Sequence, residues 1–308
     1  MSSGSVSSSA SPLVDPAVLM RIRSLEVRAR VVVEGIWRGL HRSPRHGFSV
    51  EFSEYRPYVP GDDLRHVDWR LAARSGRYFS KRYEDETNLW LQLVVDQSAS
   101  MAYGSGAWSK AAYGATLAAT LALFLMRQGD AVGVTTFASG VEEHVPPRNR
   151  PGHLRRLLTE LERPAVGRGT SLDLSIGQLA ERLRRRGVVA VVSDLLAPLE
   201  VLRGRLAELG AMGQDVVMFH VMDPAEVDLK MSEAAFFEDP EGGAGFWVDP
   251  EVARTDYRKR VEAHLAEVRA ACESAGVDYH WCQTDQPLES ALFDWVIRRR
   301  GVAARRRA

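Results

Sequence analysis

Residues 89–100 read Leu-Trp-Leu-Gln-Leu-Val-Val-Asp-Gln-Ser-Ala-Ser, and this stretch gives the strongest indication of the fold class. Six of its first seven residues are apolar, with Gln92 the exception, and this near absence of alternation predicts a strand that is buried on both faces. A long helix is expected next, over residues 109–127, because the sixteen residues 111–126 carry no charge. A helix of this kind is typically buried on all sides. A strand and a helix that are both buried indicate a parallel sheet covered by helices.

The rest of the chain repeats this alternation of apolar strands with longer helices. Strands that alternate with helices of about 10–20 residues predict an α/β fold with a doubly wound, mostly parallel sheet of about six strands. Between residues 221 and 250, two pairs of aromatic residues flank Gly242-Gly243 and predict a hairpin insertion. The further strands are expected at 131–137, 141–145 (an edge strand), 188–192, 215–221 and 277–281, and the further helices at 153–162, 172–186, 198–209, 250–274 and 288–299.

The amino-terminal third differs in texture. Residues 1–16 form a Ser-rich tail that is expected to be disordered. Residues 17–86 are expected to form a helix and then a small module of short strands, rich in aromatic and charged residues. The sheet domain is expected to span 87–300, and residues 301–308 form a basic tail that is expected to be solvated.

Composition excludes several classes of function. The chain has 308 residues, with 40 basic and 40 acidic side chains and 45% hydrophobic residues. A net charge of zero argues against general polyanion binding, which needs a positive surface. Two cysteines are too few for a disulfide framework or a four-thiolate zinc site. The start has no secretory signal pattern, and sixteen uncharged residues fall short of the roughly 20 that span a bilayer. We therefore expect a cytoplasmic protein.

The polar residues that follow the buried strands suggest a metal site. In a doubly wound sheet, ligands bind where the carboxyl ends of the strands meet. Oxygen ligands of the type that Mg²⁺ or Mn²⁺ prefers follow the strands at 89–95 and 188–192 and precede the helix at 172. Thr170 and Ser171 are adjacent, so either could supply the last hydroxyl. The expected ligands are Asp96, Ser98, Ser100, Thr170 and Asp194.

Two resemblances follow from these residues. Asp-x-Ser-x-Ser at 96–100, with Thr170 and Asp194, is similar to the metal-ion-dependent adhesion site (MIDAS) of von Willebrand factor A domains. Residues 54–69, which include Pro60-Gly61-Asp62-Asp63 and end at Trp69, resemble the signature of the bacterial domain of unknown function 58 family. This family resemblance implies an A-like domain behind the signature. It also implies association with a MoxR-type AAA+ ATPase or an associated A-domain protein.

These observations favour a non-enzymatic module whose metal binds an Asp or Glu of a partner protein. Two alternatives stay open. A Mg²⁺-dependent phosphatase or hydrolase would use Asp96 as its nucleophile, although Ser98 stands where a second acid is expected and no lysine follows a later strand suitably. A vestigial scaffold would bind its partner without metal, with Asp194 and Thr170 acting only as helix caps.

The remaining motifs are assigned structural roles. The histidines lack zinc-hydrolase spacing, so zinc hydrolase chemistry has no support. As a non-enzymatic module, the chain is expected to have neither catalytic residues nor an organic cofactor. The Gly61–Trp69 motif is expected to be a capped turn with packing aromatics. The other tryptophans at positions 90, 247, 281 and 295 are expected in the core or at an interface.

Overall fold

The computed structural model describes the chain in segments, and two compact units emerge from it. One unit comprises residues 1–38 and 89–308, and the other residues 39–88. In the smaller unit, β1 (Tyr55–Pro57) pairs antiparallel with β2 (Phe79–Lys81). The structure describes residues 13–42, 55–57, 72–74, 77–81, 89–106, 108–166, 171–183, 185–229, 234–238 and 245–305. The Gly61–Trp69 motif and Thr170 lie outside these segments.

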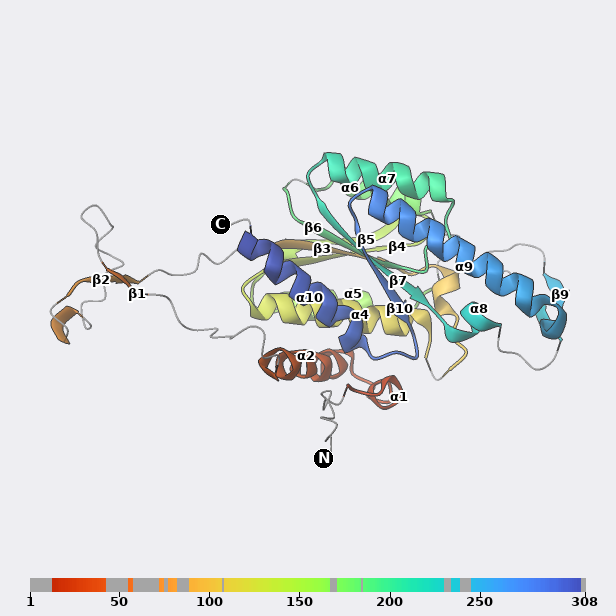
Figure 1. Cartoon of the computed structure of the whole chain (residues 1–308), viewed down its shortest axis with the longest axis horizontal. Coiled ribbons are helices and arrows are strands. Elements are labelled where there is room, and N and C mark those ends of the chain that lie inside the picture. The colour runs from red at the N-terminus through yellow and green to blue at the C-terminus, as the bar shows by residue number, and fades with distance from the viewer. Residues whose placement is uncertain are drawn as a thin grey trace, which may run out of the picture. The chain divides into compact units, whose positions relative to one another are not determined.

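A six-stranded sheet organises the larger unit, in the order β10-β7-β6-β3-β4-β5 (Figure 1). All neighbouring strands are parallel except the edge strand β5, which pairs antiparallel with β4. The predicted α/β class and mostly parallel, doubly wound sheet are therefore confirmed. The strands are β3 (Trp90–Asp96), β4 (Ala131–Phe137), β5 (Val141–Arg148), β6 (Val188–Ser193), β7 (Asp215–Met222) and β10 (Asp278–Gln283).

Helices cover both faces of the sheet (Figure 1). One face packs against α6 (Leu172–Ala180), α7 (Leu199–Ala211) and α9 (Pro250–Ser274) through a shared apolar core. The other face carries α4 (Lys110–Arg127), α5 (His153–Leu161) and α10 (Leu288–Arg305). The residues of α4 are buried from Tyr113 to Leu125, as its uncharged sequence predicted. No helix among the described residues is long and apolar enough to cross a membrane.

The amino-terminal helical segment packs on the sheet unit. It forms two helices rather than one, α1 (Pro16–Leu19) and α2 (Leu25–Arg42). The Trp37 ring of α2 lies 5.5 Å from the Phe124 ring of α4, measured between ring centroids. The Val14 amide donates to Glu289 Oε1 of α10 at 3.3 Å. Residues up to Arg38 therefore share a unit with the sheet.

Several element boundaries differ from the predictions. Helix α6 ends at Ala180 rather than at residue 186. The predicted hairpin is present as β8 (Ala235–Phe237) paired antiparallel with β9 (Phe246–Val248). Trp247, however, is 73% exposed, so it does not belong to the core, and the expectation of an interface position is left as a prediction. Short strands of a two-stranded hairpin have no second layer to cover their aromatic residues.

Strand order places the switch point of the sheet between β3 and β6. From β3 the chain adds β4 and β5 on one side, and it then returns to add β6, β7 and β10 on the other. At such a point the helical connections diverge and leave a crevice at the carboxyl ends of the two strands. Asp96 ends β3, and Asp194 directly follows Ser193 at the end of β6, so these two predicted ligands lie at the switch point.

Candidate metal centre

The carboxyl ends of β3 and β6 are joined by a direct hydrogen bond. Ser193 Oγ donates to Asp96 Oδ2 at 2.6 Å, and Asp194 follows at once along the chain. The side chains of Asp96 and Asp194 are both fully buried. Two carboxylates buried at one strand junction are unfavourable unless a counter-charge accompanies them. The site therefore holds concentrated negative charge.

The Asp-x-Ser-x-Ser motif folds into a tight turn around Asp96. The Ser98 amide donates to Asp96 Oδ1 at 2.9 Å, and Ser98 Oγ lies 3.0 Å from Ser100 Oγ. Ser98 has an extended backbone and precedes the short 3₁₀ helix Ala99–Ala102. The structure thus brings the first three predicted ligands together, with the two hydroxyl oxygens side by side.

The electrostatics of Asp96 reflect this crowding. Burial and the nearby charge of Asp194 raise the pKa of the Asp96 carboxyl to about 6, against the hydrogen bonds from Ser193 and Ser98 that lower it. The effect of Asp194 shows that the two carboxylates interact electrostatically. A positive ion between them would remove that repulsion.

A lysine that sequence reasoning did not assign to the site supplies its positive charge. Lys110, the first residue of α4, is fully buried, and its Nζ lies 2.8 Å from Asp194 Oδ2 and 2.6 Å from Glu226 Oε1. Burial lowers the pKa of Lys110, but the two carboxylates outweigh it and raise the pKa above its ordinary value. The ammonium is therefore retained as a charged group inside the site.

Neither Lys110 nor Glu226 follows the expected strand-end pattern. Lys110 lies fourteen residues after Asp96, at the start of an apolar helix, and it does not directly follow a strand. Glu226 belongs to α8 (Pro224–Asp228), a short helix that begins directly after β7. The sequence does contain one indication of the role of Lys110, which is its position directly before the uncharged run 111–126. A charged residue on a buried helix needs a counter-ion.

Asp194 Oδ1 has no hydrogen-bond partner, although it is buried. A buried carboxylate oxygen without a protein partner is costly unless a water molecule or an ion binds to it. The second oxygen of the same carboxylate is held by Lys110. Asp194 therefore faces the ammonium on one side and keeps a free acceptor on the other.

The backbone after Asp194 is strained. Leu195 has a φ of 53°, in the left-handed region that glycine favours, and its side chain is 1% exposed. Its amide donates to Ser193 Oγ at 3.0 Å, so the turn is tied to the same serine that contacts Asp96. A left-handed non-glycine residue costs about 1–3 kcal/mol and is typical of functional sites.

The N-terminal caps of α7 and α6 show whether Asp194 and the residues beside Thr170 act as helix caps. Helix α7 begins after Pro198 with no side-chain cap, so Asp194 does not cap it. Ser171 is the N-cap of α6, and its Oγ accepts from the Leu174 amide at 3.3 Å. Because Ser171 is engaged in this way, Thr170 is the better candidate for the remaining hydroxyl ligand. Thr170 itself lies outside the described residues.

The described donors fit a hard divalent cation. In the part of the chain that the structure describes, no group of three or more His, Cys, Asp or Glu side chains is placed to hold a metal ion, so hydroxyls or waters would have to complete the coordination. Mg²⁺ commonly uses one or two carboxylates and completes its octahedron with hydroxyls and waters. Asp96, Asp194 and the paired hydroxyls of Ser98 and Ser100 provide that donor set, and the unpartnered Asp194 Oδ1 is a free donor atom within it.

Comparison with known proteins identifies the family. A family described as "Protein of unknown function DUF58" matches residues 54–267. The chain belongs to this family. An uncharacterized protein of Mycobacterium tuberculosis (strain ATCC 25618 / H37Rv) is 30% identical over 297 residues, covering 94% of this chain and 92% of the relative. A shorter protein of Mycobacterium avium is 31% identical over 158 residues, 50% of this chain and 90% of its own length.

Solved structures similar to this DUF58 chain include two that cover about two thirds of it. BatB from Bacteroides thetaiotaomicron has a TM-score of 0.43 and 14% identity, over 68% of this chain and 97% of its own. The SpRpn10 VWA domain has a TM-score of 0.39 and 13% identity, over 66% and 94%. In the DUF58 chain itself, the strand order and the switch point place the candidate site.

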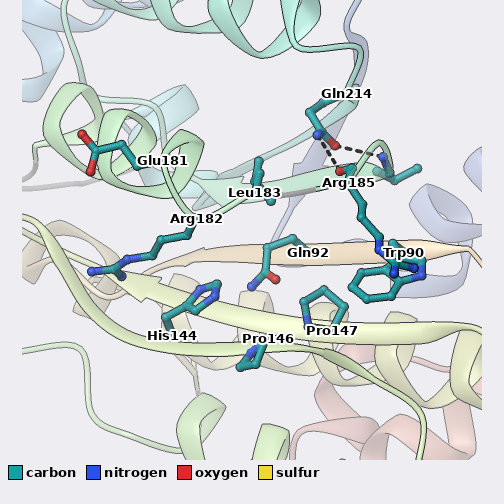
Figure 2. A pocket seen from close by; sticks show the side chains of 12 residues that line it. Trp90, Gln92, His144, Pro146, Pro147, Glu181, Arg182, Leu183, Arg185 and Gln214 are labelled. Carbon is teal, nitrogen blue, oxygen red and sulfur yellow. Dashed lines mark hydrogen bonds between the residues drawn. The ribbon is translucent and has the colours of Figure 1, made fainter.

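A hollow of the DUF58 chain lies toward the amino end of β3 and has a volume of about 430 Å³ (Figure 2). Trp90, Gln92, His144 and Arg182 line it, and the Arg185 guanidinium lies 4.7 Å from the centre of the Trp90 ring. Gln92 Nε2 donates to Thr135 Oγ1, whereas Gln92 Oε1 is buried and unpartnered.

Proposed function

We propose that this DUF58 protein is a non-enzymatic interaction module in which a divalent cation, Mg²⁺ or Mn²⁺, binds a carboxylate of a partner protein. Asp96, Ser98, Ser100, Asp194 and, by its place in the sequence, Thr170 would hold the ion. When bound, the ion supplies a Lewis-acidic position for an Asp or Glu side chain. The observation that carries the proposal is the buried, unpartnered Asp194 Oδ1 beside the turn of Asp96.

The chain's own residues support binding rather than turnover. Both oxygens of Asp96 accept hydrogen bonds, from the Ser98 amide and from Ser193 Oγ, which orient the carboxylate and make it a poor nucleophile. Lys110 is fully enclosed between two carboxylates and is not available to a phosphate. Hydrolysis needs a positioned nucleophile and a base that can accept its proton. These contacts favour the interaction module over the phosphatase.

The partner that the family resemblance implies is a MoxR-type AAA+ ATPase or an associated A-domain protein. A carboxylate from such a partner would enter at the carboxyl edge of the sheet, where the loops after β3 and β6 end. Specificity would then come from residues around the ion. The metal-free scaffold remains the alternative, and it makes the opposite prediction about chelators.

The test is capture of partners by the full chain, with Asp96→Asn as a matched bait of nearly identical shape. A purified MoxR-type ATPase from the same genome is the defined prey. We expect capture in Mg²⁺ or Mn²⁺, release by EDTA, and no capture by the variant. Equal binding in EDTA would establish the metal-free scaffold instead. Phosphoester turnover that is lost in Asp96→Asn would favour the hydrolase.

A further inference from the structure

Lys110 is a buried cation at the candidate centre, and the MIDAS-like pattern of side chains does not account for it. Its ammonium contacts Asp194 Oδ2 at 2.8 Å and Glu226 Oε1 at 2.6 Å, and the Lys110 side chain has no exposed surface. A buried lysine cannot turn into solvent when a second cation arrives. It must therefore share the carboxylates of the site with any metal ion.

The charges of the cluster are unequal. Asp96, Asp194 and Glu226 bring three carboxylates, and Lys110 brings one ammonium. With all four groups ionised the formal charge is −3 + 1 = −2, which one divalent cation would neutralise. The ammonium and that cation would both seek Asp194, because Asp194 belongs to the Lys110 pair and to the predicted ligand set. Two positive charges at one carboxylate repel each other.

Glu226, the second carboxylate that the Lys110 ammonium contacts, is itself held in a fixed position. Glu226 Oε2 accepts from the Asp223 amide at 3.0 Å, within the capping box of α8. The Glu226 carbonyl accepts from Tyr257 Oη of α9 at 2.6 Å. These bonds hold Glu226 in place independently of Lys110. An ammonium displaced from Asp194 would thus remain paired without leaving the interior.

We propose that Lys110 is a tethered competitor of the divalent cation: its ammonium bridges Asp194 and Glu226 in the metal-free protein, and it gives up Asp194 and keeps Glu226 when an ion binds. This inference rests on the proposed function, because it assigns the regulation of that same site. Lys110 then sets the metal affinity of the site. It also keeps a positive charge beside the loaded ion, which favours the approach of a partner's carboxylate.

The inference is tested by Mn²⁺ titration of the full chain, followed by the electron paramagnetic resonance signal of free Mn²⁺. Four proteins are compared: wild type, Lys110→Met, Glu226→Gln and the double variant. The double variant is the decisive control, because removing one positive and one negative charge leaves the formal charge of the cluster at −2. Circular dichroism in EDTA shows which variants fold.

We expect Lys110→Met to bind Mn²⁺ at least tenfold more tightly than wild type, since nothing then competes for Asp194. The double variant should also bind more tightly, at equal formal charge. Glu226→Gln should bind several-fold more weakly, because Lys110 is left with Asp194 alone. If Lys110→Met does not fold, the double variant decides the question.

The two claims fail in different ways. Wild-type binding of Mn²⁺ without tightening in Lys110→Met or the double variant would overturn the competitor role and leave the proposed function standing. Binding by these variants but not by wild type would support competition and contradict a metal-dependent function. Absence of binding in every protein that folds would overturn both.

Discussion

Ser193 Oγ lies 2.6 Å from Asp96 Oδ2, so the last residue of β6 holds the last residue of β3. The same hydroxyl accepts from the Leu195 amide at 3.0 Å. One serine therefore joins the two strand ends that carry the candidate centre to the strained turn after Asp194. Sequence reasoning assigned Ser193 no role because it searched for ligands rather than for the groups that orient them.

Ser193→Ala should lower the free energy of unfolding by about 1–3 kcal/mol, because the hydrogen bond to a buried carboxylate is lost. It should also weaken Mn²⁺ binding, since Asp96 is no longer held by β6. Chemical denaturation and Mn²⁺ titration measure the two effects. Ser274→Ala is the control: Ser274 Oγ donates only to the Ala271 carbonyl of α9, and its loss should leave Mn²⁺ binding unchanged.

Asp96→Asn should stabilise the metal-free protein at pH 7.5 by an amount on the order of 1–3 kcal/mol, because a buried charge near Asp194 is removed. The folded-state pKa of Asp96 is raised to about 6, above its ordinary value of 3.8, so protonation favours the folded wild type. The difference in the free energy of unfolding between Asp96→Asn and wild type should therefore shrink as the pH falls through 6 toward 4. Denaturation in EDTA at several pH values measures it, and a destabilised variant at pH 7.5 would contradict this account.

Features of this chain that depend on neighbouring residues could be predicted from the sequence, whereas contacts between distant residues could not. The apolar runs predicted β3, α4 and the parallel sheet because burial of a strand or helix leaves a local pattern. Asp96, Ser98 and Ser100 could be placed together because one turn connects them. Lys110 and Glu226 could not, since the contacts of Lys110 with Asp194 and with Glu226 depend on how α4 and α8 pack beside β6. No local spacing records a contact between residues 84 or 116 positions apart.

Leu195 gives a test of backbone strain. Leu195→Ala and Leu195→Gly both remove the buried side chain, but only glycine adopts the φ of 53° without strain. We expect the glycine variant to be more stable than the alanine variant by about 1 kcal/mol, the reverse of the usual order at ordinary positions. Parallel denaturation curves measure this difference. An alanine variant of equal or greater stability would show that the turn is not strained.

His220 supplies a prediction about acid. It lies behind Asp194, where its Nε2–H donates to the Asp194 carbonyl and its Nδ1 accepts from Tyr279 Oη. Burial lowers the pKa of His220 to about 4. Because the unfolded state takes up the His220 proton near pH 6.5, the contribution of His220 to the free energy of unfolding should fall by about 3 kcal/mol as the pH drops from 6.5 to 4, opposite in sign to the contribution of Asp96. Nuclear magnetic resonance of the ring should show a neutral His220 at pH 5, and protonation near pH 6.5 would contradict the buried hydrogen-bonded geometry.

Binding of a divalent cation at the junction of β3 and β6 is tested most directly by a crystal structure. The crystals are grown from the full chain with Mn²⁺, and anomalous scattering locates the ion. This account predicts one anomalous peak in contact with Asp96 or Asp194 and with the hydroxyls of Ser98 and Ser100, with the Lys110 ammonium on Glu226. An ordered junction with no peak at saturating Mn²⁺, and Lys110 still paired with Asp194, would contradict it.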